Sequence, residues 1–173
     1  MENLKRPTEQ EYAPYYGTYV GKVDGDDFMQ TLKNLQKETT DFLSNLNEEQ
    51  WNHRYAEGKW SVKEVMIHIL DAERVFAYRA LRIGRNDDTP LPGFEQNGYV
   101  PFYKADGRSS QSILDEYQTV RNATLSLFDN FSDEDMGRMG NASGHPVSVL
   151  GLGFIIAGHE THHMQILKER YGV

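Results

Sequence analysis

One segment near the C-terminal end of the chain decides the fold, VLGLGFIIAGHETHH at residues 149–163. It continues an apolar stretch that starts at Pro146, and it carries no charge before Glu160. A helix that is apolar nearly all round is a buried helix, so this segment predicts the central helix of a bundle. Three of the chain's six histidines lie in its last five positions. Buried imidazoles need polar partners, because burying an unpaired polar group costs free energy.

Helical spacing distinguishes these three histidines. At about 100° per residue, His163 lies about 40° from His159, whereas His162 lies about 60° away on the other side. The apolar residues of the same helix centre on the His163 side: Leu152, Ile155, Ile156, Ile166 and Leu167. A single buried histidine is usually a hydrogen-bonded core residue, but an i,i+4 pair on an apolar face brings both rings to one metal ion. We therefore predict that His159 and His163 are metal ligands.

A third ligand is expected from the upstream part of the chain. The segment spells the H-E-x-x-H motif of the zincin proteases, in which two histidines bind zinc and the glutamate is the general base. Those proteases take their third ligand downstream, and ten residues follow His163 here. The upstream candidate is His68, a turn or so into another predicted helix. Taken alone, His68 fits a structural role equally well; with His159 and His163 it completes a three-histidine set on two helices.

Capping signals mark where the first two long helices begin. Asp27, with glutamine three positions later, predicts a helix over about 27–46. Ser61 and Glu64 form a capping box, and the apolar pattern that follows continues to Gly84, a plausible stop signal.

The remaining segments are one long loop, two more helices and a tyrosine-rich start. Proline and glycine over 85–109 exclude regular structure there, and a third helix is predicted over about 110–131. A polar link leads to Pro146, which is expected to be the first residue of the fourth helix. The four tyrosines of residues 1–24 suggest a short helix that packs on the body through its aromatic face, and a turn of helix is expected near 47–51. No segment shows the period-2 alternation of a strand.

These elements predict an all-α fold, a four-helix bundle with a long crossover between the second and third helices. A chain of 173 residues suits one domain, 1–173, with a sizeable core. Ferritin-like di-iron bundles need two Glu-x-x-His motifs, and the residues around Glu160 supply one, so we set that class aside.

The amino-acid composition limits the kinds of molecule that the protein can bind. The 26 acidic residues outnumber the 18 lysines and arginines, and the net charge of −8 opposes binding to nucleic acid or to anionic membranes. The absence of cysteine excludes disulfides, thiolate ligands and a thiol nucleophile from the chain itself. No membrane-spanning segment and no apolar signal region are found, so we expect a cytoplasmic protein.

The chain resembles the DinB-like (YfiT-like) family of metal-dependent enzymes over nearly its whole length. The resemblance rests on KWSVKEV at 59–65 leading to His68, PLPGF at 90–94, KERY at 168–171, DAERVFAYR at 71–79 and GHETHH at 158–163. It implies a four-helix bundle, often a homodimer, with a metal triad at His68, His159 and His163. It also implies zinc or nickel as the cofactor. Better understood relatives transfer low-molecular-weight thiols to electrophiles.

Three neutral imidazoles leave coordination positions open on a divalent ion, which is typical of a catalytic site. Such an ion lowers the pKa of bound water to about 7 or activates a thiolate, which here would have to come from a small cosubstrate. Asp71, one turn after His68, is a candidate to orient a ligand or a water molecule. Glu160 points about 100° from His159, so it is either a residue that supports the ligands from behind or a surface residue.

Two functional classes follow from this sequence. One is a metal-dependent enzyme acting on a small molecule, either a hydrolase or a thiol transferase. The other is a non-catalytic metal-binding or stress-response protein whose ion is structural.

Overall fold

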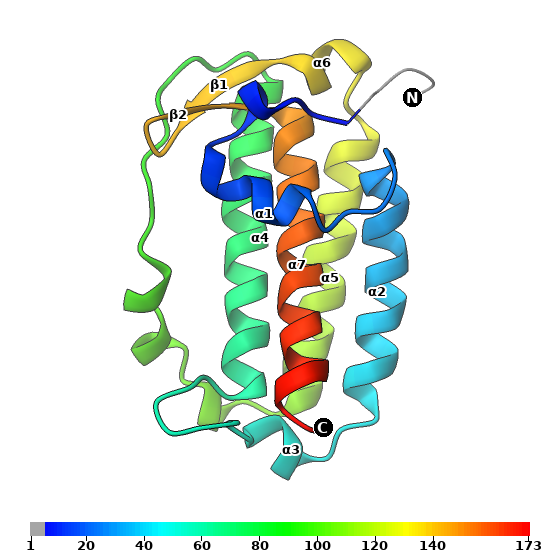
Figure 1. Cartoon of the computed structure of the whole chain (residues 1–173), viewed down its shortest axis with the longest axis vertical. Coiled ribbons are helices and arrows are strands. Elements are labelled where there is room, and N and C mark those ends of the chain that lie inside the picture. The colour runs from blue at the N-terminus through cyan, green and yellow to red at the C-terminus, as the bar shows by residue number, and fades with distance from the viewer. Residues whose placement is uncertain (1–5) are drawn as a thin grey trace.

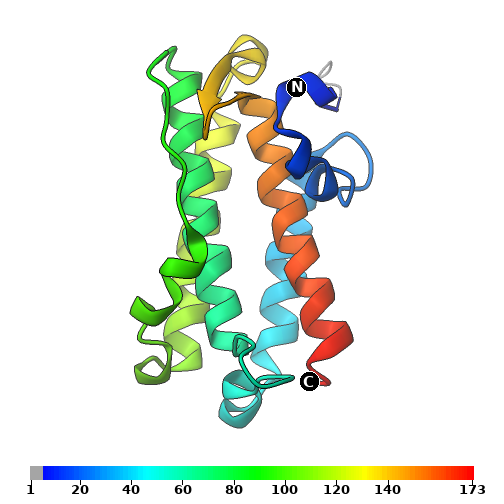
Figure 2. The same ribbon diagram turned by 60° about the vertical axis from the view of Figure 1, so that its left-hand side comes forward.

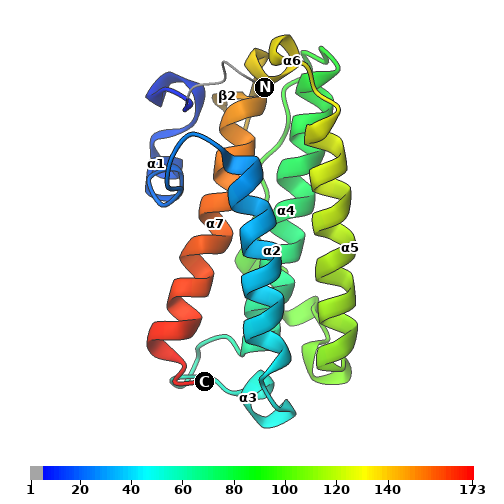
Figure 3. The same ribbon diagram turned by 90° about the vertical axis from the view of Figure 1, so that its right-hand side faces the viewer.

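Four long helices pack side by side as a bundle in the structure, a computed structural model that describes residues 6–173 (Figure 1). They are α2 (Phe28–Ser44), α4 (Val62–Gly84), α5 (Ser110–Asp129) and α7 (Val149–Arg170). Each packs against two others in the ring order α4, α7, α2, α5, and Figure 3 shows α2 between α7 and α5. The predicted four-helix bundle is confirmed. The first five residues of the predicted domain, where no signal region was found, lie outside the described part of the chain.

The predicted capping signals begin their helices. Asp27 accepts a hydrogen bond from the backbone N–H of Gln30 at 2.9 Å, and α2 starts at the next residue. Ser61 and Glu64 form both bonds of the capping box that starts α4. The turn of helix expected near 47–51 is α3 (Glu48–Asn52).

Helix α4 ends at the predicted residue, but the physical reason differs from the one expected. Gly84 is the last helical residue, and the left-handed backbone conformation falls at Asn86, with φ of 61°. Glycine is needed at 84 for another reason, because a Cβ there would lie 2.5 Å from the ring of Phe131. Gly84 therefore allows the ring to pack closely against the end of α4.

The long crossover makes α4 and α5 parallel. It runs back along the length of α4, so that both helices start at the same end of the bundle (Figure 2). It contains three short 3₁₀ turns, Gln96–Gly98, Val100–Phe102 and Ala105–Gly107, and a bridge from Leu91 to Ala142. The sequence predicted no regular structure in this proline- and glycine-containing segment. The segment indeed forms no long helix, but the prediction missed these single turns.

The link before α7 was wrongly predicted. It contains α6 (Asp133–Gly137) and an antiparallel hairpin of β1 (Met139–Ala142) and β2 (His145–Ser148). Pro146 lies in β2 opposite Asn141, so it does not start the fourth helix, which Ser148 caps by accepting from the N–H of Gly151. Ser143 and Gly144, with φ of 55° and 81°, make the tight turn that pairs the strands. Strands of four residues are too short for alternation to reveal them.

The tyrosine-rich start is not one helix. It comprises the 3₁₀ turns Glu9–Glu11 and Pro14–Tyr16 and the single-turn helix α1 (Gly17–Val20), which packs on α7 (Figure 1). The approach is close, because a Cβ on Gly158 would lie 1.9 Å from the carbonyl oxygen of Tyr19. The expected aromatic packing is found at Tyr12 and Tyr19, which are buried, whereas Tyr15 is 64% exposed.

The core is built around α7, as its sequence predicted. Every residue of this helix from Val149 to Glu160 is buried, and its apolar side chains share one hydrophobic cluster with residues of α2, α4 and α5. None of the described helices is long and apolar enough to cross a membrane.

Candidate metal centre

Three imidazole nitrogens converge between α4 and α7. The Nε2 atom of His68 lies 3.0 Å from Nε2 of His159 and 3.2 Å from Nε2 of His163. Within residues 6–173 these three form the one cluster of three or more histidines or carboxylates that could share an ion, with all candidate ligand atoms within 4.8 Å of one another. The side-by-side packing of α4 and α7 thus brings together the three histidines that the sequence singled out.

Burial keeps the three rings neutral. His68 and His159 are 1% and 4% exposed, and His163 is partly buried. Burial lowers the pKa of His68 to about 4. It also lowers the pKa of His163 to about 3, with smaller effects from His68 and His162, and it places the pKa of His159 well below its usual range. At neutral pH each ring therefore has a nitrogen lone pair available for a ligand.

The spacing of these nitrogens fits one divalent ion. Zinc–nitrogen bonds of about 2.0–2.1 Å at tetrahedral angles place ligand nitrogens about 3.3 Å apart. The 3.0 and 3.2 Å separations around His68 are close to that value. Hydrogen bonds satisfy the His68 nitrogen and its two neighbours poorly, because each neutral ring has only one N–H to donate.

Aromatic side chains fix the positions of the histidine rings. The ring of Trp60 lies 5.0 Å from that of His68, and Tyr19 lies edge-on to His159 at 5.2 Å. Phe76 packs on His159 from α4 at 6.2 Å. These large side chains restrict the rotamers that the imidazole rings can adopt.

His162 lies outside the cluster, as the helical spacing predicted. Its ring packs on Tyr19 at 5.5 Å and on His163 at 5.2 Å. Burial lowers its pKa, and the charges of Lys22 and Arg170 lower it further.

The two residues proposed to support the ligands have other partners. Asp71 is partly exposed and lies 3.6 Å from Arg74; burial, together with Glu116, raises its pKa. Asp71 therefore pairs with an arginine and not with a ligand histidine. Glu160 is 1% exposed, so the surface alternative for it is wrong.

Glu160 belongs to a buried polar cluster that the sequence analysis missed. Its carboxylate accepts hydrogen bonds from Thr39 at 2.7 Å, from Tyr117 at 2.6 Å and from Arg121. Arg121 also donates to Glu73 at 2.8 and 3.0 Å. A signal for it was present, because Arg121 interrupts the apolar stripe of α5, where a charged residue needs a buried partner.

Two cavities adjoin the three histidines. One, of about 270 Å³, reaches His163 and is walled by aromatic residues, Tyr55, Trp60 and Tyr171. The other, of about 280 Å³, reaches His159 and is walled by Tyr15, Tyr16, Tyr19, Phe76 and Phe94. Asn97, from the crossover, lines both. The tyrosines of the N-terminal segment were expected only to pack, and their place beside His159 depends on tertiary contacts.

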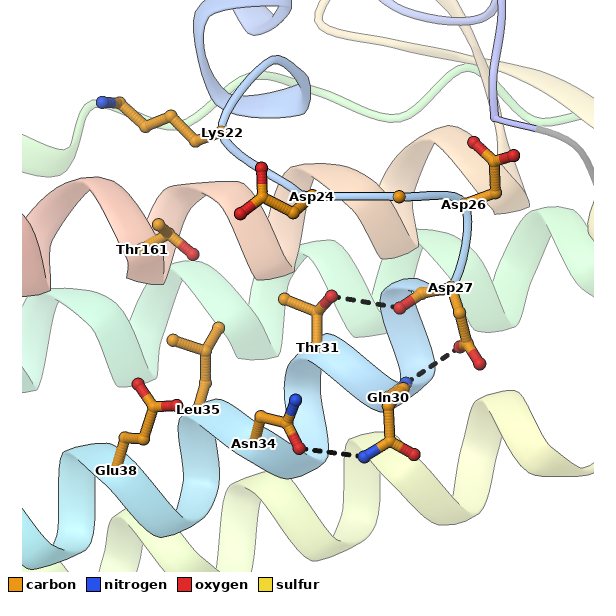
Figure 4. Close-up of a pocket in the computed structure, with 11 residues that line it drawn as sticks. Lys22, Asp24, Asp26, Asp27, Gln30, Thr31, Asn34, Leu35, Glu38 and Thr161 are labelled. Carbon is orange, nitrogen blue, oxygen red and sulfur yellow. Dashed lines mark hydrogen bonds between the residues drawn. The ribbon is translucent and has the colours of Figure 1, made fainter.

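A larger cavity, of about 370 Å³, lies away from the histidines (Figure 4). Asp24, Asp26 and Glu38 line it between the link that follows α1 and the helix α2, with Thr161 contributed by α7. The carboxyl group of Asp27 is engaged as the cap of α2. In the described part of the chain these carboxylates do not come close enough together to form a second three-ligand cluster.

The fold and the cluster define a class of protein, a four-helix bundle with a long crossover and three histidines between two of its helices. The chain matches the model of the DinB superfamily over residues 31–167, and it belongs to that superfamily.

Three similar proteins agree with this membership. A protein of Oceanobacillus iheyensis named "Putative metal-dependent hydrolase OB0413" is 25% identical over 155 residues, which cover 85% of this chain and 87% of that protein. The solved structure of YfiT from Bacillus subtilis, described as a "probable metal-dependent hydrolase with an unusual four-helix bundle topology", has a TM-score of 0.70 and 16% identity, covering 96% of this chain and 93% of that one. The DinB-like protein YjoA from Bacillus subtilis has a TM-score of 0.61 and 16% identity, covering 84% and 89%.

Proposed function

We propose that this protein is a metal-dependent enzyme that holds one divalent ion through His68, His159 and His163. The observation that carries the proposal is the convergence of three neutral Nε2 atoms, two from buried histidines and one from the partly buried His163, at distances that fit one ion. Membership of the DinB superfamily and the name of the Oceanobacillus relative support it. Imidazole ligands suit zinc and nickel, the two metals that the family resemblance implies.

The residues of the chain prepare the site in two ways. Burial keeps the imidazoles neutral, so that all three can act as ligands without first losing a proton. The aromatic walls hold the rings in place, and the two cavities leave space beside His159 and His163 for reactants. When bound, a divalent ion with three imidazole ligands supplies Lewis-acid activation of water or of a thiol.

Two reactions fit this arrangement, and one observation favours transfer. A hydrolase needs space for one substrate and water, whereas a transferase needs space for two reactants. The two cavities of similar size, each adjoining a different ligand histidine and both lined by Asn97, suit two reactants. Because the chain has no cysteine, a thiol would come from a low-molecular-weight cosubstrate.

The experiment loads the purified protein with zinc or nickel and compares two sets of reactions. The first set offers small thiols with a generic electrophile, and the second offers panels of esters, amides and phosphoesters. Turnover counts for the site only if His159→Ala abolishes it and the neighbouring His162→Ala retains it. Turnover confined to the thiol set supports the transferase, and turnover confined to the hydrolytic panels supports the hydrolase. A metal-loaded protein that is silent in both favours the non-catalytic alternative.

The proposal also includes the assembly and location that the sequence suggested. We propose a homodimer, which the family resemblance implies, working in the cytoplasm. Light scattering on the eluting protein tests the dimer, and a mass corresponding to one chain of 173 residues contradicts it.

A further inference from the structure

A buried cluster of charged side chains joins all four long helices of the bundle. Arg121 of α5, Glu73 of α4 and Glu160 of α7 are 0%, 2% and 1% exposed. The guanidinium of Arg121 donates to both carboxylates and to the backbone carbonyl of Leu32 in α2. We call Arg121, Glu73 and Glu160 the Arg121 cluster.

Stability alone does not account for this cluster. Removing charged groups from water is costly, and replacing a buried ion-pair triad by well-packed apolar residues is often neutral or stabilising. What an ion pair adds is direction, because its hydrogen bonds form only at particular distances and angles. Apolar contacts lack that restriction.

Directional hydrogen bonds matter most for the rotation of α7 about its own axis. This helix is apolar around its whole circumference from Val149 to Gly158, so hydrophobic burial alone specifies its rotation weakly. The carboxylate of Glu160 is held from two other helices, by Thr39 of α2 and by Tyr117 and Arg121 of α5. These three donors define which way α7 faces.

The rotation of α7 decides whether the three histidines meet. Glu160 directly follows His159, and Glu73 lies on α4 five residues after His68. A helix with side chains has a radius of about 5–6 Å, so a rotation of about 20° moves a ring nitrogen by about 2 Å. Metal–ligand distances tolerate only about 0.2 Å.

We propose that Glu160 and Glu73, joined through Arg121, are positioning residues that hold α7 and α4 at the rotation where His68, His159 and His163 can share one ion. This inference rests on the metal site of the proposed function. The three residues of the Arg121 cluster are neither members of the three-histidine cluster nor among the residues that line the adjoining cavities, so they act through the helices.

The test uses two variants of the full chain and one matched control. In the first, Glu73→Leu, Arg121→Met and Glu160→Leu are combined, which removes the charges and keeps the core apolar. The second is Glu160→Gln, nearly the same shape as the native side chain. The control is Glu116→Gln, which breaks the partly exposed pair between Glu116 of α5 and Arg74 of α4.

Urea unfolding of the metal-free proteins is measured first, followed by cobalt(II) affinity and the absorption spectrum of bound cobalt under conditions where each protein is fully folded. We expect the apolar triple variant to resist urea at least as well as the native protein. We also expect it to bind cobalt about 10- to 100-fold more weakly with a changed spectrum, the loss typical of residues that orient ligands. Glu160→Gln should weaken binding about tenfold, and the control should match the native protein.

A folded triple variant with native affinity and spectrum overturns the positioning role and leaves the metal site standing. If the triple variant does not fold, native affinity in Glu160→Gln overturns it in the same way. A native protein that binds no cobalt overturns the proposed function and this inference together.

Discussion

Two neighbouring histidines on α7 allow a sharp comparison, His163→Ala against His162→Ala. The Nε2 atom of His163 lies in the three-nitrogen cluster, 3.2 Å from that of His68, whereas the ring of His162 packs outside it against Tyr19. Both side chains are partly buried and lie on the same helix, so each substitution removes one imidazole without removing a fully buried side chain. We expect only His163→Ala to lose metal affinity.

The magnitude follows from the number of ligands. Structural zinc sites with four protein ligands bind with about 10–16 kcal/mol, so each ligand contributes about 2.5–4 kcal/mol. Loss of one of three ligands should therefore raise the dissociation constant about 10²- to 10³-fold. An alanine at 163 would open toward the adjoining cavity of about 270 Å³, where water can replace the ring, so the cost to folding should be small.

The assay is an equilibrium competition between the metal-free protein and a chromogenic chelator, with zinc and then nickel. Far-UV circular dichroism first establishes that each variant is folded. His68→Ala and His159→Ala should lose affinity as His163→Ala does. Native affinity in His163→Ala, or a comparable loss in His162→Ala, would refute the assignment of the pair and the reasoning from helical spacing.

Three further predictions concern stability. The metal-free protein should lose several kcal/mol of stability as the pH falls below about 6.5 toward 4, because the pKa values of His68 (about 4) and His163 (about 3) lie below the value of about 6.5 in the unfolded chain, which then binds more protons. Urea unfolding at pH 7 and pH 5 measures this loss, and equal stabilities would contradict it. Chelation of the metal should lower the melting temperature but preserve the helical circular dichroism, because a bundle of this length buries a core without an ion. An unfolded metal-free protein would instead indicate a structural metal site. Gly158→Ala should lower the free energy of unfolding by about 1–3 kcal/mol or more, because the new Cβ would meet the carbonyl oxygen of Tyr19. The control Gly137→Ala should be nearly neutral, because nothing lies within 4 Å of a Cβ there. Thermal melts compare the two variants, and equal melting temperatures would argue against the close packing of α1 on α7.

The local features of the fold were readable from the sequence. Asp27 and Ser61 start helices through bonds to residues three positions away, and such short-range contacts leave a signal in the sequence itself. The apolar circumference of α7 could also be read directly from its residues, and it indicated a buried central helix. The hairpin was missed because its strands are four residues long, so Pro146 was placed at a helix start that lies at Val149.

The residues of the candidate site were likewise predictable from the sequence only in part. Helical spacing selected His159 and His163 over His162, because the angle between residues on one helix is fixed by the chain. His68 lies on another helix, and only its meeting with the other two in the packed bundle gives it a place in the cluster.

Other features depended on tertiary contacts alone. The periodicity of a helix tells which side chains face inward, but it does not tell which helix they will meet. For that reason the sequence left Glu160 between two alternatives, and the packed bundle gives it Thr39, Tyr117 and Arg121 as partners from two other helices. The cavities beside the histidines likewise combine walls from the N-terminal segment, the crossover and α4, segments that lie far apart in the chain and come together only when the bundle closes.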